Sequence, residues 1–360
     1  MSDFKPGLEG VVAFETEIAE PDRDGGALRY RGVDIEDLVG RVPFENVWGL
    51  LVDDALVPGL EPVAPYAARE LTGDAPADVQ AVAAHLSGEW GLRKLIDISD
   101  DEARADLARL SATMLSVVAQ SARFADGNTT AVDANLVASG TTAATRFLLE
   151  WRGEADPKHV RAIDTYWICT AEHGLNASTF AARVVASTGA DCGAALSSAV
   201  GALSGPLHGG APARVLPMLD GAAAADSIEG YVKDLLDSGD RLMGFGHRVY
   251  RAEDPRSRLL RGTAMDLGSA RFAVAEELER AALAELHRRK PDRVLATNVE
   301  FWSAVVLDVA DVPPELAPAM FASSRTAGWS AHILEQKRLN RLIRPSAVYV
   351  GPGPRPLPSA

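Results

Sequence analysis

The sequence has little cysteine and lacks the short motifs of several large enzyme classes. Its two cysteines, Cys169 and Cys192, lie in apolar or small-residue stretches, so we expect buried packing residues. No Cys-x-x-Cys and no histidine–cysteine cluster at metal-ligand spacing occurs, so no metal site is predicted. The Gly-x-Gly-x-x-Gly fingerprint, the P-loop and the Gly-x-Ser-x-Gly elbow are also missing. These absences argue against a Rossmann site, a P-loop site and an acyl-enzyme.

Long hydrophobic runs are missing too. No stretch of 18 apolar residues occurs, so we expect no membrane-spanning helix. The start, MSDFKPGLEG, has neither a basic region nor an apolar core, so we expect no secretion signal and a cytoplasmic protein. The net charge of −14 argues against nucleic acid or an anionic membrane as a partner. An anionic substrate would need a local cationic pocket.

Helical periodicity dominates, whereas β-branched alternation is scarce, so a mainly α fold is predicted. A chain of 360 residues exceeds the usual size of one core, which favours two domains. Two short strands, 11–15 and 27–30, are predicted to flank a turn. We expect helices over residues 45–56, 77–90, 101–124, 133–152, 158–188, 191–204, 226–238, 256–289, 298–309 and 314–340.

The segment 191–204, DCGAALSSAVGALS, consists almost entirely of small residues. Small faces let helices approach closely, so this is either a tightly packed core helix or a subunit interface. Gly205-Pro206 should end the helix. His208 therefore lies on a turn before two glycines, where the backbone has room to approach a ligand.

His208 in GPLHGG and His247 in GFGHR both lie in glycine-flanked loops. Because neither lies on an amphipathic face, both are candidates for a functional role. His173 in AEHGLNAST is, by its own context, better explained as a structural histidine. Glu300 ends the run Thr-Asn-Val-Glu, which fits a helix capping box.

Three arginines stand in short distinctive motifs: Arg256 in DPR, Arg325 in SRTAG and Arg344 in IRP. Guanidinium forks are natural receptors for carboxylates. Most arginines of such a chain are surface residues, so only the motif context distinguishes these three.

Taken together and in their order, these segments resemble the citrate synthase family. The resemblance runs from GLEGVVAFET to VGPG and covers nearly all 360 residues, most weakly between about 60 and 165. It implies a two-domain helical fold with minor β structure near the N-terminus. A small helical domain, 211–315, would be inserted into a large domain formed by 1–210 and 316–360. The active site would lie in the cleft between them.

The resemblance also assigns chemical roles. His208 would hydrogen-bond the thioester carbonyl of acetyl-CoA, and Glu300 would remove a methyl proton. His247 would polarise the ketone of oxaloacetate. The carboxylates of oxaloacetate would be bound by His173, Arg256, Arg325 and Arg344.

The family further implies a homodimer with shared sites, in which Arg344 reaches the neighbouring pocket. The GFGHRVYR loop would contact CoA through Gly244, Gly246, Arg248 and Arg251. Acetyl-CoA would be a co-substrate, with no permanently bound cofactor, and the reaction would belong to the tricarboxylic acid cycle.

One residue departs from the family pattern. Most members carry aspartate where this chain has Glu300, which is one methylene longer. The motifs also fit 2-methylcitrate synthase, which uses propionyl-CoA. A third alternative is a catalytically weak paralogue that binds CoA or citrate in a regulatory role.

Overall fold

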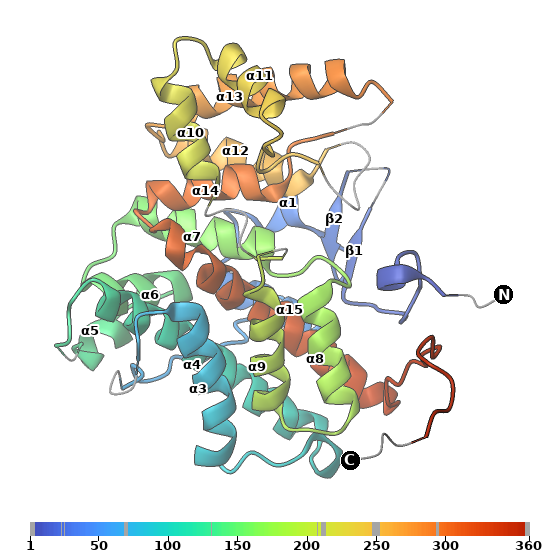
Figure 1. Cartoon of the computed structure of the whole chain (residues 1–360). Coiled ribbons are helices and arrows are strands. Elements are labelled where there is room, and N and C mark those ends of the chain that lie inside the picture. The colour runs from blue at the N-terminus through green and yellow to red at the C-terminus, as the bar shows by residue number, and fades with distance from the viewer. Residues whose placement is uncertain are drawn as a thin grey trace.

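The computed structural model describes residues 4–22, 24, 26–67, 71–130, 132–206, 208–209, 214–246, 253–292 and 295–356. The fold is mainly helical, which confirms the prediction (Figure 1). Its helices are α1 Ile35–Leu38, α2 Phe44–Asp53, α3 Ala75–Glu89, α4 Asp100–Ala125, α5 Ala134–Ala138, α6 Ala143–Arg152, α7 Pro157–Thr170, α8 Ala177–Ser187, α9 Cys192–Leu203, α10 Val215–Ala224, α11 Ile228–Asp237, α12 Pro255–Asp266, α13 Phe272–Arg289, α14 Val299–Val309 and α15 Ala317–Leu339. Short 3₁₀ helices occur at η1 Pro6–Leu8, η3 Leu95–Asp97 and η5 Pro314–Leu316.

A small antiparallel sheet lies near the N-terminus, but its first strand is not the predicted one. The order is β1 (Ala19–Pro21), β2 (Leu28–Tyr30) and β3 (Val33–Asp34). The predicted strand over 11–15 is wrong, because these residues belong to no strand and are largely exposed. The turn between β1 and β2 brings Ala19–Pro21, rather than 11–15, beside β2, and a strand needs a partner as well as alternation.

Three predicted helices are each split into two. The range 133–152 breaks at the Ser-Gly pair between α5 and α6. The range 158–188 breaks before Gly174, and 256–289 breaks at Gly268; their φ angles are 63° and 68°. Gly268 directly follows the C-cap of α12, a position where a left-handed glycine ends a helix. The other predicted helices lie within a few residues of the observed bounds, whereas α10 and the short α1 were not predicted.

The helix α15 is the central element of the fold (Figure 1). It packs against α2, α4, α7, α8 and α9, and its side chains are buried around nearly the whole circumference. A helix buried on all sides belongs to the core of a large domain. Polar side chains on α15 are therefore held inside the protein, where they need partners or a ligand.

The small-residue helix α9 packs closely against α3 and α8. A Cβ at Gly193 would lie 2.2 Å from Oγ of Ser87 and 2.5 Å from the carbonyl oxygen of Ala83. The packed-core interpretation therefore holds for this face of α9. Other residues, including Ser197 and Gly201, are only partly buried, so a subunit interface there stays a prediction.

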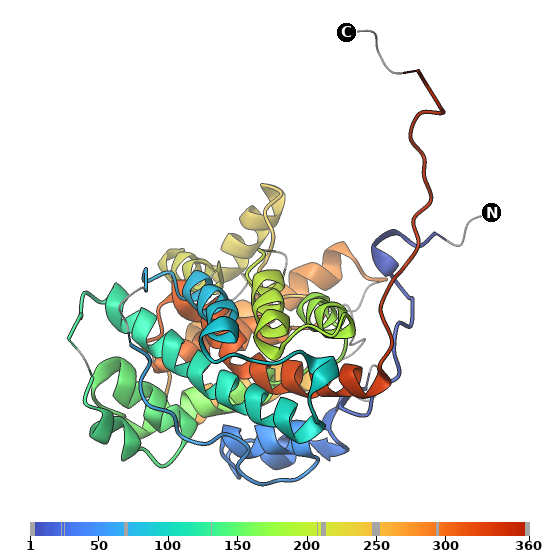
Figure 2. The ribbon, with the colours of Figure 1, turned by 90° about the horizontal axis from the view of Figure 1, so that it is seen from below.

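At the other end of the molecule, α10, α11 and α13 lie together beyond α14 (Figure 1). After α15, residues 341–356 form neither helix nor strand and run away from the helical body (Figure 2). In the part of the chain that the structure describes, no helix is both long and apolar enough to cross a membrane.

Candidate active site

The turn after α9 holds His208. The carbonyl oxygen of Gly205 accepts the His208 main-chain N–H at 2.9 Å, and that of Leu203 accepts the Gly209 N–H at 3.0 Å. A Cβ at Gly209 would lie 2.5 Å from the Leu203 oxygen, so the turn requires glycine there. This is the predicted glycine-flanked turn, although Gly210 lies outside the described residues.

The His208 ring faces the start of α8. The main-chain N–H of Ser178 donates to Nε2 at 3.4 Å, and Ser178 Oγ lies 2.9 Å from the same nitrogen. The Asn176 side chain, which caps α8, lies 3.2 Å from Nε2. Because a main-chain N–H only donates, Nε2 accepts, and a neutral ring carries its proton on Nδ1. Burial and the charge of Arg325 lower the pKa of His208 to about 4, so the ring is neutral at pH 7.

Arg325 is a buried guanidinium in the middle of α15, with 2% of its surface exposed. Its Nε donates to the carbonyl oxygen of Thr170 at 2.9 Å, and its guanidinium carbon lies 4.7 Å from the ring centroid of Phe321. Its Nη1 is buried without a hydrogen-bond partner among the described residues. A fixed guanidinium with an unused donor suits a carboxylate ligand.

Arg256 is buried as well, and its guanidinium pairs with Asp254 through two hydrogen bonds. Nε and Nη2 donate to the two carboxylate oxygens at 2.9 and 2.8 Å. Asp254 is the N-cap of α12 and also accepts the main-chain N–H of Val299 at 3.0 Å. This one carboxylate therefore joins α12, which carries Arg256, to α14, which carries Glu300.

Glu300 lies in the first turn of α14 but forms no capping box. The side chain of Asn298 caps the helix by accepting the Glu300 main-chain N–H at 3.0 Å. The Thr297 hydroxyl is buried and has no partner among the described residues. The capping-box interpretation is therefore wrong: with Asn298 as the cap, Glu300 occupies the second helical position rather than the third.

The Glu300 carboxyl is mostly shielded from water, and this burial raises its pKa to about 7. The positive charge of Arg256 opposes the rise, whereas the negative charge of Asp254 adds to it. A carboxyl group with a pKa near 7 exchanges protons readily at neutral pH, as a general base requires.

These side chains lie near enough to act on one another electrostatically. Beyond the effect of burial, Arg325 lowers the pKa of His208, and Arg256 lowers that of Arg325. Arg256 in turn acts on Glu300. Four of the predicted site residues, from a turn and three helices, therefore share one electrostatic environment.

Gly244 and Gly246 of the predicted CoA loop lie against the start of α14. Their φ angles are 84° and 88°, and a Cβ at Gly244 would lie 2.6 Å from Cβ of Phe301. The Asn298 main chain donates to the Gly244 oxygen at 2.9 Å, and its side chain donates to the Gly246 oxygen at 3.0 Å. Asn298 thus fixes both the loop and the helix of Glu300. The rest of the predicted loop site, His247, Arg248 and Arg251, lies outside the described residues.

Two further predicted ligands, His173 and Arg344, lie in segments outside these helices. His173 lies in the turn between α7 and α8, where it is partly exposed. Arg344 is exposed in the tail after α15 and forms no ion pair with any described residue. Its placement would suit a residue that serves another chain, but the role stays a prediction.

Sequence analysis missed the residues that support the site. Asp254, before a proline that opens a helix, and Asn176, before an Ala-Ser-Thr run, carry helix N-cap signals that could have been found. Glu172 and His332 have no local signal because their partners come from distant parts of the chain. Over the described ranges, no cluster of three or more histidine, cysteine or acidic side chains is arranged to hold a metal ion.

The chain is similar to known proteins over nearly its whole length. The family model described as citrate synthase, C-terminal domain, matches residues 7–346. A protein named putative citrate synthase 2 from Mycobacterium bovis is 61% identical over 98% of this chain and 94% of its own length. The citrate synthase of Haloferax volcanii is 39% identical, over 97% and 96% of the two chains.

A 2-methylcitrate synthase from Shewanella oneidensis is 33% identical, over 99% of this chain and 98% of its own. Among solved structures, the citrate synthase of Thermoplasma acidophilum matches with a TM-score of 0.86 and 28% identity. The match covers 99% of this chain and 98% of that one, which was solved as a ternary complex with carboxymethyl coenzyme A and oxaloacetate.

Proposed function

Because the chain belongs to the citrate synthase family of acyltransferase-type enzymes, we propose that it condenses acetyl-CoA with oxaloacetate to form citrate and CoA. The observation that carries this proposal is the shared environment of one carboxyl group, one neutral imidazole and two buried guanidiniums. The carboxyl has a pKa near 7, which suits a base. The imidazole is neutral, which suits a hydrogen-bond donor to an oxygen that gains negative charge.

Glu300 is the base in this mechanism. It takes one proton from the methyl group of acetyl-CoA, and the C–H electron pair forms the enol double bond. The additional methylene, compared with aspartate, moves the carboxylate by about an ångström, to which proton-transfer geometry is sensitive. The cap at Asn298 fixes the start of α14 and so limits that movement.

His208 stabilises the enol. Since Nε2 accepts from the Ser178 main chain, Nδ1–H is the donor left for the thioester oxygen. With a pKa of about 4, the ring is neutral at pH 7, so it offers a hydrogen bond and carries no additional proton to transfer. Asn176 and Ser178 hold the ring in this orientation.

The enol carbon then attacks the ketone carbon of oxaloacetate and forms the new C–C bond. The ketone π electrons move to its oxygen, which takes up one proton in place of the one lost by the methyl group, and citryl-CoA results. His247 polarises the ketone, and Arg256, Arg325 and His173 bind the carboxylates of oxaloacetate. Water hydrolyses the thioester to citrate and CoA. The buried Nη1 of Arg325 supports its assignment, because it offers a donor that no described residue uses.

CoA would lie along the loop that contains Gly244, Gly246, Arg248 and Arg251. Residues 211–315 would form a small domain that closes over both substrates and excludes water. We further propose a homodimer in which Arg344 of the extended tail completes the neighbouring site. A cytoplasmic enzyme of the tricarboxylic acid cycle fits this activity.

Membership of the family does not decide whether the acyl donor is acetyl-CoA or propionyl-CoA. One relative carries the name 2-methylcitrate synthase, and one methylene in an acyl pocket is worth only about 1–3 kcal/mol. The test is release of the CoA thiol with oxaloacetate present, using acetyl-CoA and propionyl-CoA in parallel. A higher kcat/KM for acetyl-CoA supports citrate synthesis, whereas a higher value for propionyl-CoA supports methylcitrate synthesis. No release with either would leave the chain a CoA- or citrate-binding paralogue.

A further inference from the structure

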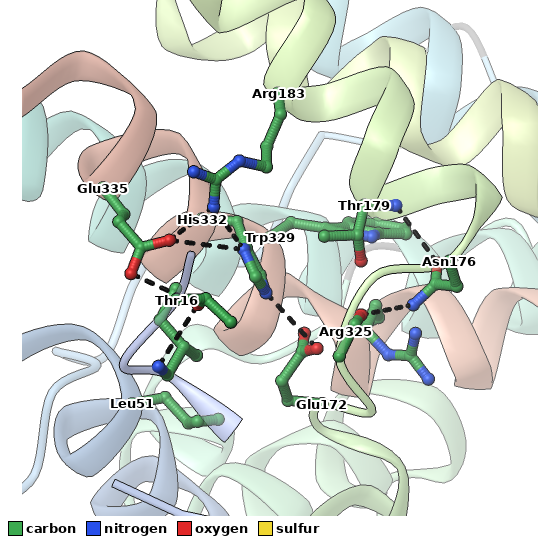
Figure 3. A network of polar contacts seen from close by, with 12 residues as sticks. Thr16, Leu51, Glu172, Asn176, Thr179, Arg183, Arg325, Trp329, His332 and Glu335 are labelled. Carbon is green, nitrogen blue, oxygen red and sulfur yellow. Dashed lines mark hydrogen bonds and ion pairs between the residues drawn. The ribbon is translucent and has the colours of Figure 1, made fainter. Parts of the chain in front are cut away.

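A chain of buried polar side chains runs along one face of α15 (Figure 3). Arg183 of α8 is fully buried and pairs with Glu335. Its Nη1 also lies 2.8 Å from Nδ1 of His332. At the outer end, Glu335 accepts from the hydroxyl of Thr16 and the main chain of Glu17. Such a chain is costly to bury unless its charges are compensated.

The two ring nitrogens of His332 face different partners. A guanidinium has donors and no acceptor, so Nδ1 of His332 accepts from Arg183 and Nε2 is the nitrogen left for another partner. That nitrogen faces Glu172, with Nε2 and Oε1 3.4 Å apart. His332 therefore connects the Arg183–Glu335 pair to Glu172.

Glu172 has no exposed surface and fits into a notch on α15. The notch exists because residue 328 is glycine: a Cβ there would lie 1.9 Å from Oε2 of Glu172. Burial would raise the pKa of Glu172, but His332 and the charge of Arg325 outweigh it, and the pKa is lowered. Glu172 is therefore a buried carboxylate, ionised at neutral pH.

One face of α15 carries Arg325, Gly328 and His332, because these residues are spaced three and four positions apart in the helix. Figure 3 shows the Glu172 carboxylate between His332 and Arg325 on this face. Glu172 raises the pKa of Arg325, opposing the effect of burial, yet no ion pair joins the two side chains directly. Arg256 differs, because its guanidinium contacts Asp254 through two hydrogen bonds.

This difference has a chemical consequence. A buried guanidinium needs a negative charge nearby, but a carboxylate in contact with it would compete with a carboxylate ligand. Glu172 supplies the charge from a distance, while Thr170 and Phe321 hold the guanidinium in place. Nη1 is thereby left for a ligand.

We propose that Glu172, held by His332 and the notch at Gly328, is the non-contacting counter-charge that keeps Arg325 buried and ready for a substrate carboxylate. The proposal rests on the proposed function, in which Arg325 binds oxaloacetate. In this arrangement Glu172 stabilises the unliganded protein and lowers the affinity for the dianion. It acts through Arg325 and is a positioning residue.

The test is Glu172→Gln, which keeps the size and hydrogen-bonding oxygen of the side chain and removes its charge. Calorimetric titration with oxaloacetate should show binding about three- to tenfold tighter than in the wild type. The reason is that the positive charge of Arg325 is no longer compensated by Glu172, at an effective dielectric constant near 20 or above. The melting temperature of the free protein should fall. Tighter binding by a less stable protein is not expected from structural damage alone. Unchanged or weaker binding, with a wild type that does bind, would overturn the proposal.

The matched control is Glu335→Gln, which removes a charge from the same chain at the end remote from Arg325. It should lower the melting temperature and leave the oxaloacetate affinity within about twofold, because screening weakens distant charges. Tightening equal to that of Glu172→Gln would contradict a specific effect on Arg325. If the wild type itself fails to bind oxaloacetate, the proposed function fails instead.

A second variant, Glu172→Asp, decides the matter if Glu172→Gln does not fold. It keeps the charge and withdraws it by one methylene, so it should fold and bind oxaloacetate with nearly wild-type affinity. Failure of Glu172→Asp to fold would show that side-chain fit, rather than charge, is what Glu172 supplies.

Discussion

The side chain of Asn298 accepts the main-chain N–H of Glu300, and this bond frees the Glu300 carboxylate from helix capping. The same asparagine donates to the Gly246 carbonyl, so it fixes the base and the loop beside it. The carboxylate faces the charges of Arg256 and Asp254 rather than its own helix end. That geometry favours a chemical role over a structural one.

Replacing Glu300 by glutamine should therefore abolish most activity. We expect kcat to fall by about 10²- to 10⁴-fold, the usual contribution of a general base, while the melting temperature stays within a few degrees. Glu300→Asp should retain measurable turnover because a carboxylate remains. Steady-state kinetics and thermal unfolding of both variants provide the check, and a nearly normal kcat in Glu300→Gln would refute the assignment.

The pH dependence should follow the same carboxyl group. A base acts when deprotonated, so kcat/KM should rise with pH through about 7, the pKa of Glu300 raised by burial. His208 should add no inflection above pH 5, because burial and Arg325 keep its pKa at about 4. A pH–rate profile from 5 to 9 measures this. Activity that is flat between 6 and 8 would disagree with Glu300 as the base.

Glu150 provides a prediction about stability away from the site. It is buried in α6, where it accepts from Ser116 and Gln120, and burial raises its pKa to about 7. A raised folded-state pKa gives stability that is complete below the unfolded value and lost as pH rises through about 7. Glu150→Gln should therefore reduce the loss of unfolding free energy between pH 5 and 8 by about 1–3 kcal/mol.

Urea unfolding of wild type and Glu150→Gln at both pH values measures that difference. The exposed Glu154→Gln variant, two residues after α6, serves as the control and should leave the pH dependence unchanged. Equal pH dependence in wild type and Glu150→Gln would show that the carboxyl is not buried in its neutral form.

Mixing two inactive variants tests whether the proposed homodimer shares its active sites between chains. Arg344→Ala and Glu300→Gln should each be nearly inactive alone. In a mixed dimer, the chain with Arg344→Ala supplies an intact Glu300, and its partner supplies the arginine, so one site is complete. Random reassortment should restore about a quarter of wild-type activity. No recovery after verified subunit exchange would make Arg344 a ligand of its own chain or a bystander.

Local signals carried most of what the sequence could predict. Glycine and proline at 205–210 placed His208 on a turn, and periodicity located most helices. The wrong predictions also concerned local features. The predicted helices continued across Gly174 and Gly268, and Thr297 was predicted as the N-cap of the helix that Asn298 caps. Only the second error was a choice between two residues that both fit the pattern of a helix N-cap.

The remaining features depend on tertiary structure. The pKa of Glu300 depends on burial and on Arg256 and Asp254, which reach it only through the packing of α12 on α14. Glu172 and His332 are separated by 160 positions in the chain, and no local pattern links them. Their pairing required the fold.

Acetyl-CoA with a fully deuterated methyl group tests the central claim most directly. If the enzyme forms an enol by removing one methyl proton, mass spectrometry of the citrate produced with oxaloacetate should show the loss of one deuterium and retention of the others. Glu300→Gln should form little citrate, and EDTA should change neither the product nor the rate. Release of CoA without oxaloacetate, or full retention of the methyl deuterium, would contradict the account.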